Sequence, residues 1–388
     1  MNPVSSLPAI ISLFVAVLTT YLITRWVGAT PNKNRFASID GLRGYLAFFV
    51  FLHHSSIWFF YLRSGQWKVP PSNLYTHFGQ SSVALFFMIT GFLFFSKIID
   101  GKTRGLDWGK LFISRFMRLV PLYLFSMFLL FSIVAFLSNG ILNESLPNLF
   151  KNAIYWLGFT IPGAPNLNGV DHTSIIVAGV TWSLPYEWLF YFSLPLLALT
   201  VRLKPPYLFL ALGLTGVASI SIWLPKFHHL LSFLGGISAS FLVRVNVFRE
   251  FAVKPIASYL IIFCIAILLI TFPSARGILP IFLISLSFSL IASGNSLFGT
   301  LTHPISRTLG EIAYSIYLLH GIALFLLFTF VVGIDDAKNI SPTTHWLFII
   351  AITPLLILIS FFTFRLIERP AMQSTNLVTL WIRSRLTH

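Results

Sequence analysis

A basic side chain and a histidine share one face of a single apolar stretch. Arg43 stands at the start of the apolar run 44–62, and His54 follows it by eleven residues. Eleven residues complete three α-helical turns within roughly 20°, so both side chains lie on one face, about 16 Å apart, whereas His53 points about 100° away. The pair suits an anionic ligand at the membrane edge and proton transfer deeper in. Lipid anchoring by Arg43 and packing of His54 explain the same pattern.

Arg115 and Arg118 stand three residues apart, just before the apolar run 119–138. Residues at this spacing are neighbours on a helix surface. Two neighbouring guanidinium forks bind phosphate oxygens bidentately, which favours a phosphate-containing ligand. A positive anchor at the inner membrane surface is the alternative explanation.

Glu187 is the acidic residue that we place inside an apolar run, where a carboxylate needs a partner. Ser183 is a candidate N-cap and Pro185 fits the first turn, so Glu187 lies about 6 Å below the outer surface. Because His54 reaches a similar depth, we expect the two side chains to meet. The pair is either a functional group or a structural ion pair.

Tyr317 and His320 are three residues apart and share one helix face. Aromatic packing explains Tyr317 well, whereas His320 suits a site and a packing role equally. We treat the two as an additional candidate site. The sequence offers no serine nucleophile elbow and no glycine-rich phosphate loop as a rival.

The elements that position these side chains are predicted to be membrane helices. Of the 388 residues, 56% are hydrophobic and 10% are charged, against roughly 25% charged residues in soluble domains. The 41 Phe and 10 Trp favour a protein in lipid with aromatic interfacial belts. This composition excludes a cytosolic globular enzyme, a disordered chain and a fibrous repeat. Cys264, the single cysteine, excludes an intrachain disulfide and a Cys-based zinc site, and we expect no metal.

Eleven apolar runs are long enough to cross a hydrocarbon core of roughly 30 Å. We therefore predict an all-α polytopic membrane protein with about 11 transmembrane helices in one bundle. The run 149–161 is short and ends in Pro162-Gly163, which favours an interfacial or re-entrant segment. The eleven runs are residues 7–24, 44–62, 81–97, 119–138, 183–201, 207–223, 229–243, 256–272, 278–293, 312–333 and 345–364.

The distribution of basic residues predicts the topology. With the N-terminus outside, the inner segments hold 20 Lys and Arg and the outer segments hold 6, which is a strong positive-inside asymmetry. The net charge of +15 therefore reports orientation, and we expect no nucleic-acid partner. Residues 1–6 carry no Lys or Arg and no A-x-A site follows, so we expect the first helix to stay uncleaved.

Four segments in this order resemble signatures of the bacterial integral-membrane acyltransferase 3 family: SIDGLRGYLAFFVFLHH, RFMRLVP, WSLPYEWLFYFSLPLL and LGEIAYSIYLLH. The resemblance implies transfer of an acyl group, usually acetyl from cytoplasmic acetyl-CoA, to a hydroxyl of a cell-envelope polysaccharide or a lipid-linked sugar. The family's essential Arg and His, separated by ten residues, fall on Arg43 and His54. Its R-x-x-R motif falls on Arg115 and Arg118. The implied location is the bacterial inner membrane, and the positive-inside asymmetry predicts that the C-terminus is in the cytoplasm.

The resemblance divides the chain into three predicted parts. They are an additional N-terminal transmembrane helix over residues 1–30, an acyltransferase-3-like membrane domain over 31–372 and a cytoplasmic tail over 373–388. The additional helix departs from the family pattern, and the esterase-like domain fused to some relatives has no counterpart in this sequence. Transfer is therefore expected to finish inside the membrane domain or on a separate periplasmic partner.

In the expected mechanism, Arg115 and Arg118 bind the phosphates of acyl-CoA and Arg43 directs the thioester toward His54. His54 activates the acceptor hydroxyl or carries the acyl group itself, and Glu187 orients or charge-stabilises the imidazole. A proton-coupled secondary transporter of a small anionic solute is the main alternative, because buried His, Glu and Arg also suit a transport path. A lipid-binding or assembly subunit is a third, and it would not need His54.

Cysteine labelling tests the topology. With Cys264 replaced by Ala, a cysteine introduced at position 105 should react from the cytoplasmic side and one at position 165 from the outside. The reason is the positive-inside asymmetry of the segments that contain these positions. Labelling of both positions from the same side would contradict the span count and the cytoplasmic entry of the donor.

Overall fold

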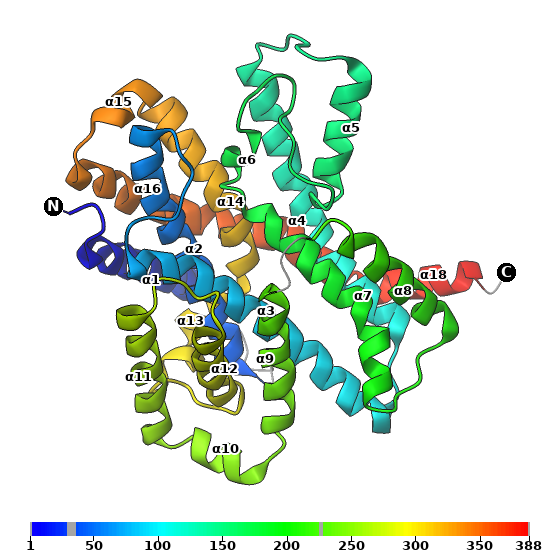
Figure 1. The fold of residues 1–388 in the computed structure, drawn as a ribbon. Helices are drawn as coiled ribbons and strands as arrows, with labels where there is room; N and C mark the ends of the chain where they lie inside the picture. The colour runs from blue at the N-terminus through cyan, green and yellow to red at the C-terminus, as the bar shows by residue number, and fades with distance from the viewer. Residues whose placement is uncertain (1, 29–35, 225–227, 387–388) are drawn as a thin grey trace. The chain divides into compact units, whose positions relative to one another are not determined.

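The computed structural model describes residues 2–28, 36–224 and 228–386, which fold almost entirely into helices (Figure 1). Apart from one isolated bridge between Leu167 and Val170, these residues form no β-structure. The expected all-α polytopic membrane fold is confirmed. The predicted domain boundary between residues 30 and 31 lies outside the described residues.

The chain folds into two compact units, and the divisions fall inside helices. Unit 1 comprises Met1–Leu93 and Phe227–Ser360, and unit 2 comprises Phe94–Lys226 and Phe361–His388. Helix α3 (Asn73–Arg104) and helix α16 (Pro342–Thr363) each contribute to both units.

Unit 1 contains the N-terminal helix, the helix with His54 and the helices from α9 to α16. Besides α3 and α16, its elements are α1 (Ser6–Val27), α2 (Ala37–Ser64), α9 (His228–Leu242), α10 (Asn246–Ala252), α11 (Pro255–Thr271), α12 (Ile278–Ala292), the 3₁₀ turn η2 (Thr300–Thr302), α13 (Pro304–Glu311), α14 (Ala313–Leu326), the π-helical turn η3 (Leu327–Val331) and α15 (Ile334–Asn339).

Unit 2 contains the helix with the paired arginines and the helix with Glu187. Its further elements are α4 (Trp108–Leu137), α5 (Leu146–Leu157), α6 (Thr173–Ile176), the 3₁₀ turn η1 (Val180–Ser183), α7 (Leu184–Thr200), α8 (Tyr207–Ser221), the π-helical turn η4 (Phe364–Glu368), α17 (Arg369–Gln373) and α18 (Thr375–Leu386). With 12 residues, α5 is too short to cross a core of roughly 30 Å. It exposes Leu146 and Phe150, which agrees with the interfacial segment expected near 149–161.

Each of the eleven predicted apolar runs coincides with one or more helices. Among the described residues, six helices are long and apolar enough to cross a membrane, or seven if the pair α9–α10, bent by 105°, is one span. Helices α8, α11 and α12 are apolar but shorter. The positions of the helices are therefore confirmed, and the number of eleven crossings stays a prediction.

Helix α4 begins earlier than the hydropathy predicted, at Trp108 instead of near residue 119. Asp107 caps it, because its carboxylate accepts from the Lys110 N–H at 3.0 Å and pairs with Arg383 at 2.7 Å. Partial burial alone raises the pKa of Asp107, but these hydrogen bonds and charges outweigh it and lower the pKa overall. The hydropathy is low over the charged residues that precede the apolar run, so it does not reveal this part of the helix. The cap at Asp107 allows the helix to begin before these residues.

The backbone of α2 lies in direct contact with the backbones of α13 and the turn η2. A Cβ atom on Gly310 would lie 1.8 Å from the carbonyl oxygen of Asp40, and one on Gly41 would lie 1.9 Å from that of Leu301. Gly44 has the same restriction against the backbone of α13. Only glycine permits this approach. It brings the first and the fourth signature segments together, and with them α2 and α14.

Gly310→Ala tests this contact. The added methyl overlaps the α2 backbone, so we expect a stability loss of about 1–3 kcal/mol and a lower Tm in detergent. Gly109→Ala is the control, because its Cβ would meet nothing closer than an Asp107 oxygen at 3.7 Å and alanine is the better helix former. Equal Tm values for the two variants would contradict the close contact.

Candidate active site

The structure brings His54 of α2 and His320 of α14 into direct contact. Nε2 of His320 lies 2.9 Å from Nδ1 of His54, and the ring centroids are 5.0 Å apart. His320 is completely buried, whereas His54 keeps partial exposure. Of the two histidines, His54 is therefore the one that is accessible from the surface.

Backbone carbonyls determine which ring nitrogens of this pair carry protons. Nδ1 of His320 lies 3.0 Å from the carbonyl oxygen of Ile316, and since a carbonyl only accepts, this nitrogen donates. In a neutral ring Nε2 of His320 then accepts, so Nδ1–H of His54 donates to it. Nδ1 of His54 also lies 3.1 Å from the carbonyl oxygen of Val50, which requires the same tautomer. The hydrogen-bond network thus leaves Nε2 of His54 unprotonated and basic.

His53, the neighbour of His54, has a structural environment. Its Nδ1 donates to the carbonyl oxygen of Tyr75 at 2.7 Å, and a Cβ on Gly79 would lie 2.5 Å from its ring. The Tyr75 hydroxyl in turn donates to the carbonyl oxygen of Ser5 at 2.8 Å. His53 therefore holds α2 against α3, and the prediction that it points away from the site face is confirmed.

Arg43 and Tyr317 lie on the same two helices as the histidine pair. Helix α2 is unbroken from Ala37 to Ser64, so the spacing that places Arg43 on the face of His54 is preserved. The Tyr317 ring is buried, with its centroid 6.2 Å from that of His320 and 5.9 Å from that of Phe86. These ring contacts favour the packing role for Tyr317.

Trp67 is a neighbour of His54 that the sequence pattern does not single out. Its ring centroid lies 6.1 Å from that of His54 at an interplanar angle of 16°. Trp58 and Tyr61 hold the indole by edge contacts at 5.7 and 5.3 Å. Gly65, with φ of 67°, ends α2 and turns the chain back. Helical periodicity gives no signal for a side chain in such a loop.

Unit 2 gathers three cations where the sequence predicted two. Cζ of Arg115 lies 4.7 Å from the ring centroid of Phe94, and Nζ of Lys97 lies 5.3 Å from the same centroid. Lys97 belongs to the end of α3, which runs past the predicted span 81–97. Attraction to one aromatic ring offsets part of the repulsion between the two cations. With Arg118 one helical turn from Arg115, the cluster suits a polyanionic ligand.

Arg118 has a donor in need of an acceptor. Its Nη1 lies 2.9 Å from the sulfur of Met372. Its Nη2 is buried and makes no hydrogen bond within the part of the chain that the structure describes. Leaving a buried guanidinium N–H unpaired is costly. An anion whose oxygen reaches this nitrogen would remove that cost.

Glu187 lies in the first turn of α7, which begins directly after Ser183 as predicted. Ser183 is the N-cap residue of α7, as predicted, and its hydroxyl donates to the carbonyl oxygen of Val180 at 3.3 Å. Glu187 attracts Arg115 electrostatically, and Tyr191 is hydrogen-bonded to Arg115. This arrangement gives the carboxylate a charge partner inside unit 2. The expected pairing of Glu187 with His54 stays a prediction, because the two residues belong to different units.

The family model of acyltransferase 3, described as an acyltransferase domain, matches residues 36–365. The matched range contains α2, α4, α7 and α14, and with them every candidate site residue. No curated protein and no solved structure matches the chain.

Arg115→Lys tests the anion site. The substitution keeps the positive charge and loses the planar fork, so binding of the phosphate-rich compound CoA should weaken by about tenfold. Arg104→Ala removes an exposed charge at the end of α3 and should leave binding nearly unchanged. Titration calorimetry of the purified variants measures both. Equal losses would assign Arg115 to membrane anchoring.

Proposed function

The chain belongs to the acyltransferase 3 family, and from this premise we propose that it moves an acetyl group from cytoplasmic acetyl-CoA to a hydroxyl of a cell-envelope polysaccharide or glycolipid. The observation that carries the proposal is the His54–His320 hydrogen bond, which leaves a basic nitrogen on the partly exposed His54. A histidine in this state suits general-base catalysis at neutral pH.

In the proposed reaction, Nε2 of His54 removes the proton of the acceptor hydroxyl. The hydroxyl oxygen attacks the thioester carbonyl, the C–S bond breaks, and the imidazolium returns the proton to the departing CoA thiolate. His320 accepts from Nδ1–H of His54 throughout, so it fixes the orientation of the ring and stabilises the imidazolium. The carboxylate of a hydrolase triad has the same role. If His54 itself accepts the acyl group, the same Nε2 is the nucleophile.

The cations of unit 2 are the proposed donor site. Arg115, Arg118 and Lys97 supply the positive charge that the phosphates of acetyl-CoA require, and the unpaired Nη2 of Arg118 is a ready donor for one phosphate oxygen. Glu187 and Tyr191 hold Arg115 in place. Arg43 is assigned the task of directing the thioester toward His54.

Trp67 is the proposed wall on the acceptor side. The positive-inside asymmetry predicts that the loop after α2 lies outside, where an envelope glycan would arrive. The indole offers an apolar face and one N–H donor, 6.1 Å from the His54 ring. An acceptor held against this face has its hydroxyl within reach of the proposed base.

The two adjacent histidines provide the test of the function. His54→Ala should reduce acyl transfer by about 100-fold or more, because the general base is lost. His53→Ala should cost about 1–3 kcal/mol of stability through the lost hydrogen bond to Tyr75 and keep most of the transfer per folded molecule. Release of CoA thiol by purified protein, with mass spectrometry of the envelope glycans, measures acyl transfer in both variants.

Membrane fractionation establishes that both variants insert. Transfer abolished in His53→Ala and retained in His54→Ala would contradict the proposed base. An absence of thiol release by the wild-type protein with every envelope glycan offered would contradict the acyl-CoA donor.

His320 is proposed as a positioning residue, and its substitutions separate that role from simple packing. His320→Ala removes the acceptor for Nδ1–H of His54, so kcat should fall at least about tenfold, corresponding to one lost hydrogen bond, with KM for acyl-CoA unchanged. His320→Gln keeps an acceptor oxygen and should retain more activity. Equal activities of the Ala and Gln variants, or a change in KM alone, would contradict this role.

A further inference from the structure

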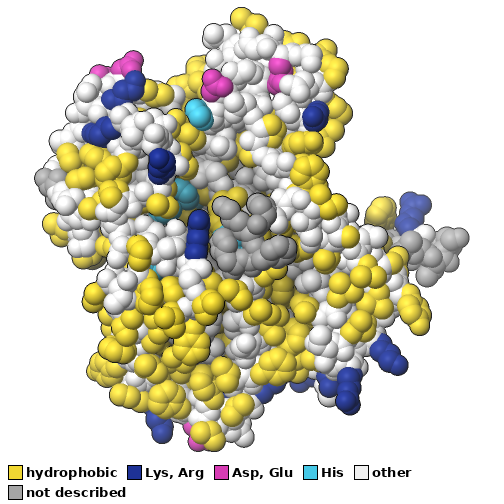
Figure 2. All heavy atoms as spheres, in the orientation of Figure 1, with side chains coloured by type: hydrophobic (Ala, Val, Ile, Leu, Met, Phe, Trp, Pro, Cys, Tyr) yellow, Lys and Arg dark blue, Asp and Glu magenta, His cyan; other side chains and the backbone are white. Residues whose placement is uncertain are grey.

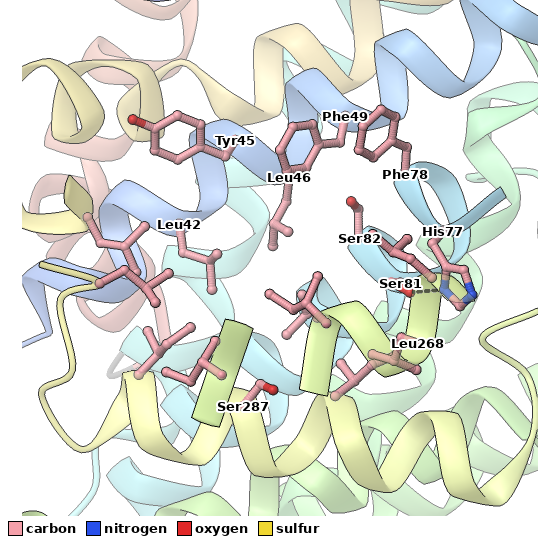
Figure 3. Close-up of a pocket in the computed structure, with 18 of the residues that line it drawn as sticks. Leu42, Tyr45, Leu46, Phe49, His77, Phe78, Ser81, Ser82, Leu268 and Ser287 are labelled. Carbon is pink, nitrogen blue, oxygen red and sulfur yellow. Dashed lines mark hydrogen bonds between the residues drawn. The ribbon is translucent and has the colours of Figure 1, made fainter. Parts of the chain in front are cut away.

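Unit 1 encloses a cavity of about 310 Å³ between α2, α3, α11 and α12 (Figure 3). On α2 its wall includes Leu42, Leu46 and Phe49, which share one helix face. Arg43 and His54 occupy a different face of α2, roughly 100° away. The volume lies at the lower end of the range for small-molecule sites, about 300–1,000 Å³.

Three polar side chains of the wall, those of His77, Ser81 and Ser287, have partners within the chain. His77 donates from Nε2 to the carbonyl oxygen of Phe272 at 2.7 Å and accepts at Nδ1 from the Ser81 hydroxyl at 2.7 Å. The Ser287 hydroxyl donates to the carbonyl oxygen of Leu283 at 3.0 Å. The lining residues include no Lys, Arg, Asp or Glu. The cavity therefore suits hydrocarbon, and it has no charged group for a phosphate or a carboxylate.

The cavity reaches the surface beside α11. Ile265 lines it and is 43% exposed. Ile262 and Phe263, its neighbours on α11, are 49% and 61% exposed. Hydrophobic side chains cover this part of the unit 1 surface (Figure 2). In a bilayer, the material that meets such an opening is the hydrocarbon of lipid tails.

We propose that the cavity binds one acyl tail of a bilayer phospholipid. Its wall extends from Leu42 to Phe49 on α2 and from Ile261 to Leu269 on α11, about 10–12 Å along each helix, which accommodates a segment of one tail. An apolar space of this kind does not retain water. A tail that leaves the bilayer gains no hydrophobic energy, so the binding force is dispersion contact with walls that otherwise lack partner atoms.

Photolabelling in vesicles tests the proposal. The probe is a phosphatidylethanolamine with a diazirine in the middle of one acyl chain, diluted into unlabelled phosphatidylethanolamine, and the labelled positions are read by peptide mass spectrometry. Ile261, Leu268 and Ile284 are 0%, 4% and 3% exposed, so a tail reaches them only from inside the cavity. We expect label at these three positions. Ile262 and Phe263 face the bulk lipid and are the internal standard.

Two substitutions fill the cavity from different walls. Ser287→Leu and Ser82→Leu should each lower the cavity labelling at least tenfold and leave the labelling of the internal standard unchanged, which also shows that each variant is inserted. Ser219→Leu, on the exposed side of α8, is the matched control and should change nothing. His54→Ala should keep the cavity labelling, because this proposal does not rest on acyl transfer.

Label confined to the internal standard in the wild-type protein would overturn the proposal. Unchanged cavity labelling in both filling variants would overturn it as well. Loss of cavity labelling on addition of equimolar polyprenyl phosphate would assign the space to a lipid carrier and overturn the choice of a phospholipid.

Discussion

The contact between the start of α2 and helix α13 is the constraint on which the histidine pair depends. Gly310 lies so close to the carbonyl of Asp40 that a single methyl group would separate the two backbones. Helix α14 begins two residues after α13 ends, so this contact fixes where His320 stands relative to His54. A hydrogen bond of 2.9 Å between side chains of two helices requires that the helices be held in a fixed relative position. Glycine therefore acts here through its missing side chain, at a distance from the chemistry.

Polar groups in unit 1 follow a common rule that the membrane environment explains. Backbone carbonyls bind an imidazole nitrogen of His53, His77, His320 and His345. An imidazole without a partner is expensive in a medium that lacks water, and carbonyls are the acceptors that helices and loops provide. Nδ1 of His345 is buried and has no partner in the described part of the chain, whereas His54, which bonds through Nδ1 to the Val50 carbonyl, is partly exposed. Its partial exposure distinguishes it from the structural histidines.

Periodicity and hydropathy predicted much of the architecture, and their failures have identifiable causes. The common face of Arg43 and His54 follows from helical geometry alone, and α2 preserves it. The meeting of His54 and His320 could not be derived, since 266 positions separate them and a repeat pattern carries no pairwise information. Trp67 could not be predicted for another reason, because it lies in a loop, where side chains follow no helical period. Lys97 was not predicted as a site residue, because the hydropathy falls where the charged residues begin, although helix α3 continues to Arg104.

The anchoring of both histidine rings of the candidate site by their own helices has a consequence for sequence variation. His54 bonds to the carbonyl of Val50 and His320 to that of Ile316, each four positions earlier. Every amino acid supplies the same carbonyl, so substitutions at Val50 and Ile316 change local packing and leave the proton placement intact. The helical backbone alone therefore determines the tautomer of both rings. Substitutions at these two positions are therefore compatible with an unchanged, unprotonated Nε2 on His54.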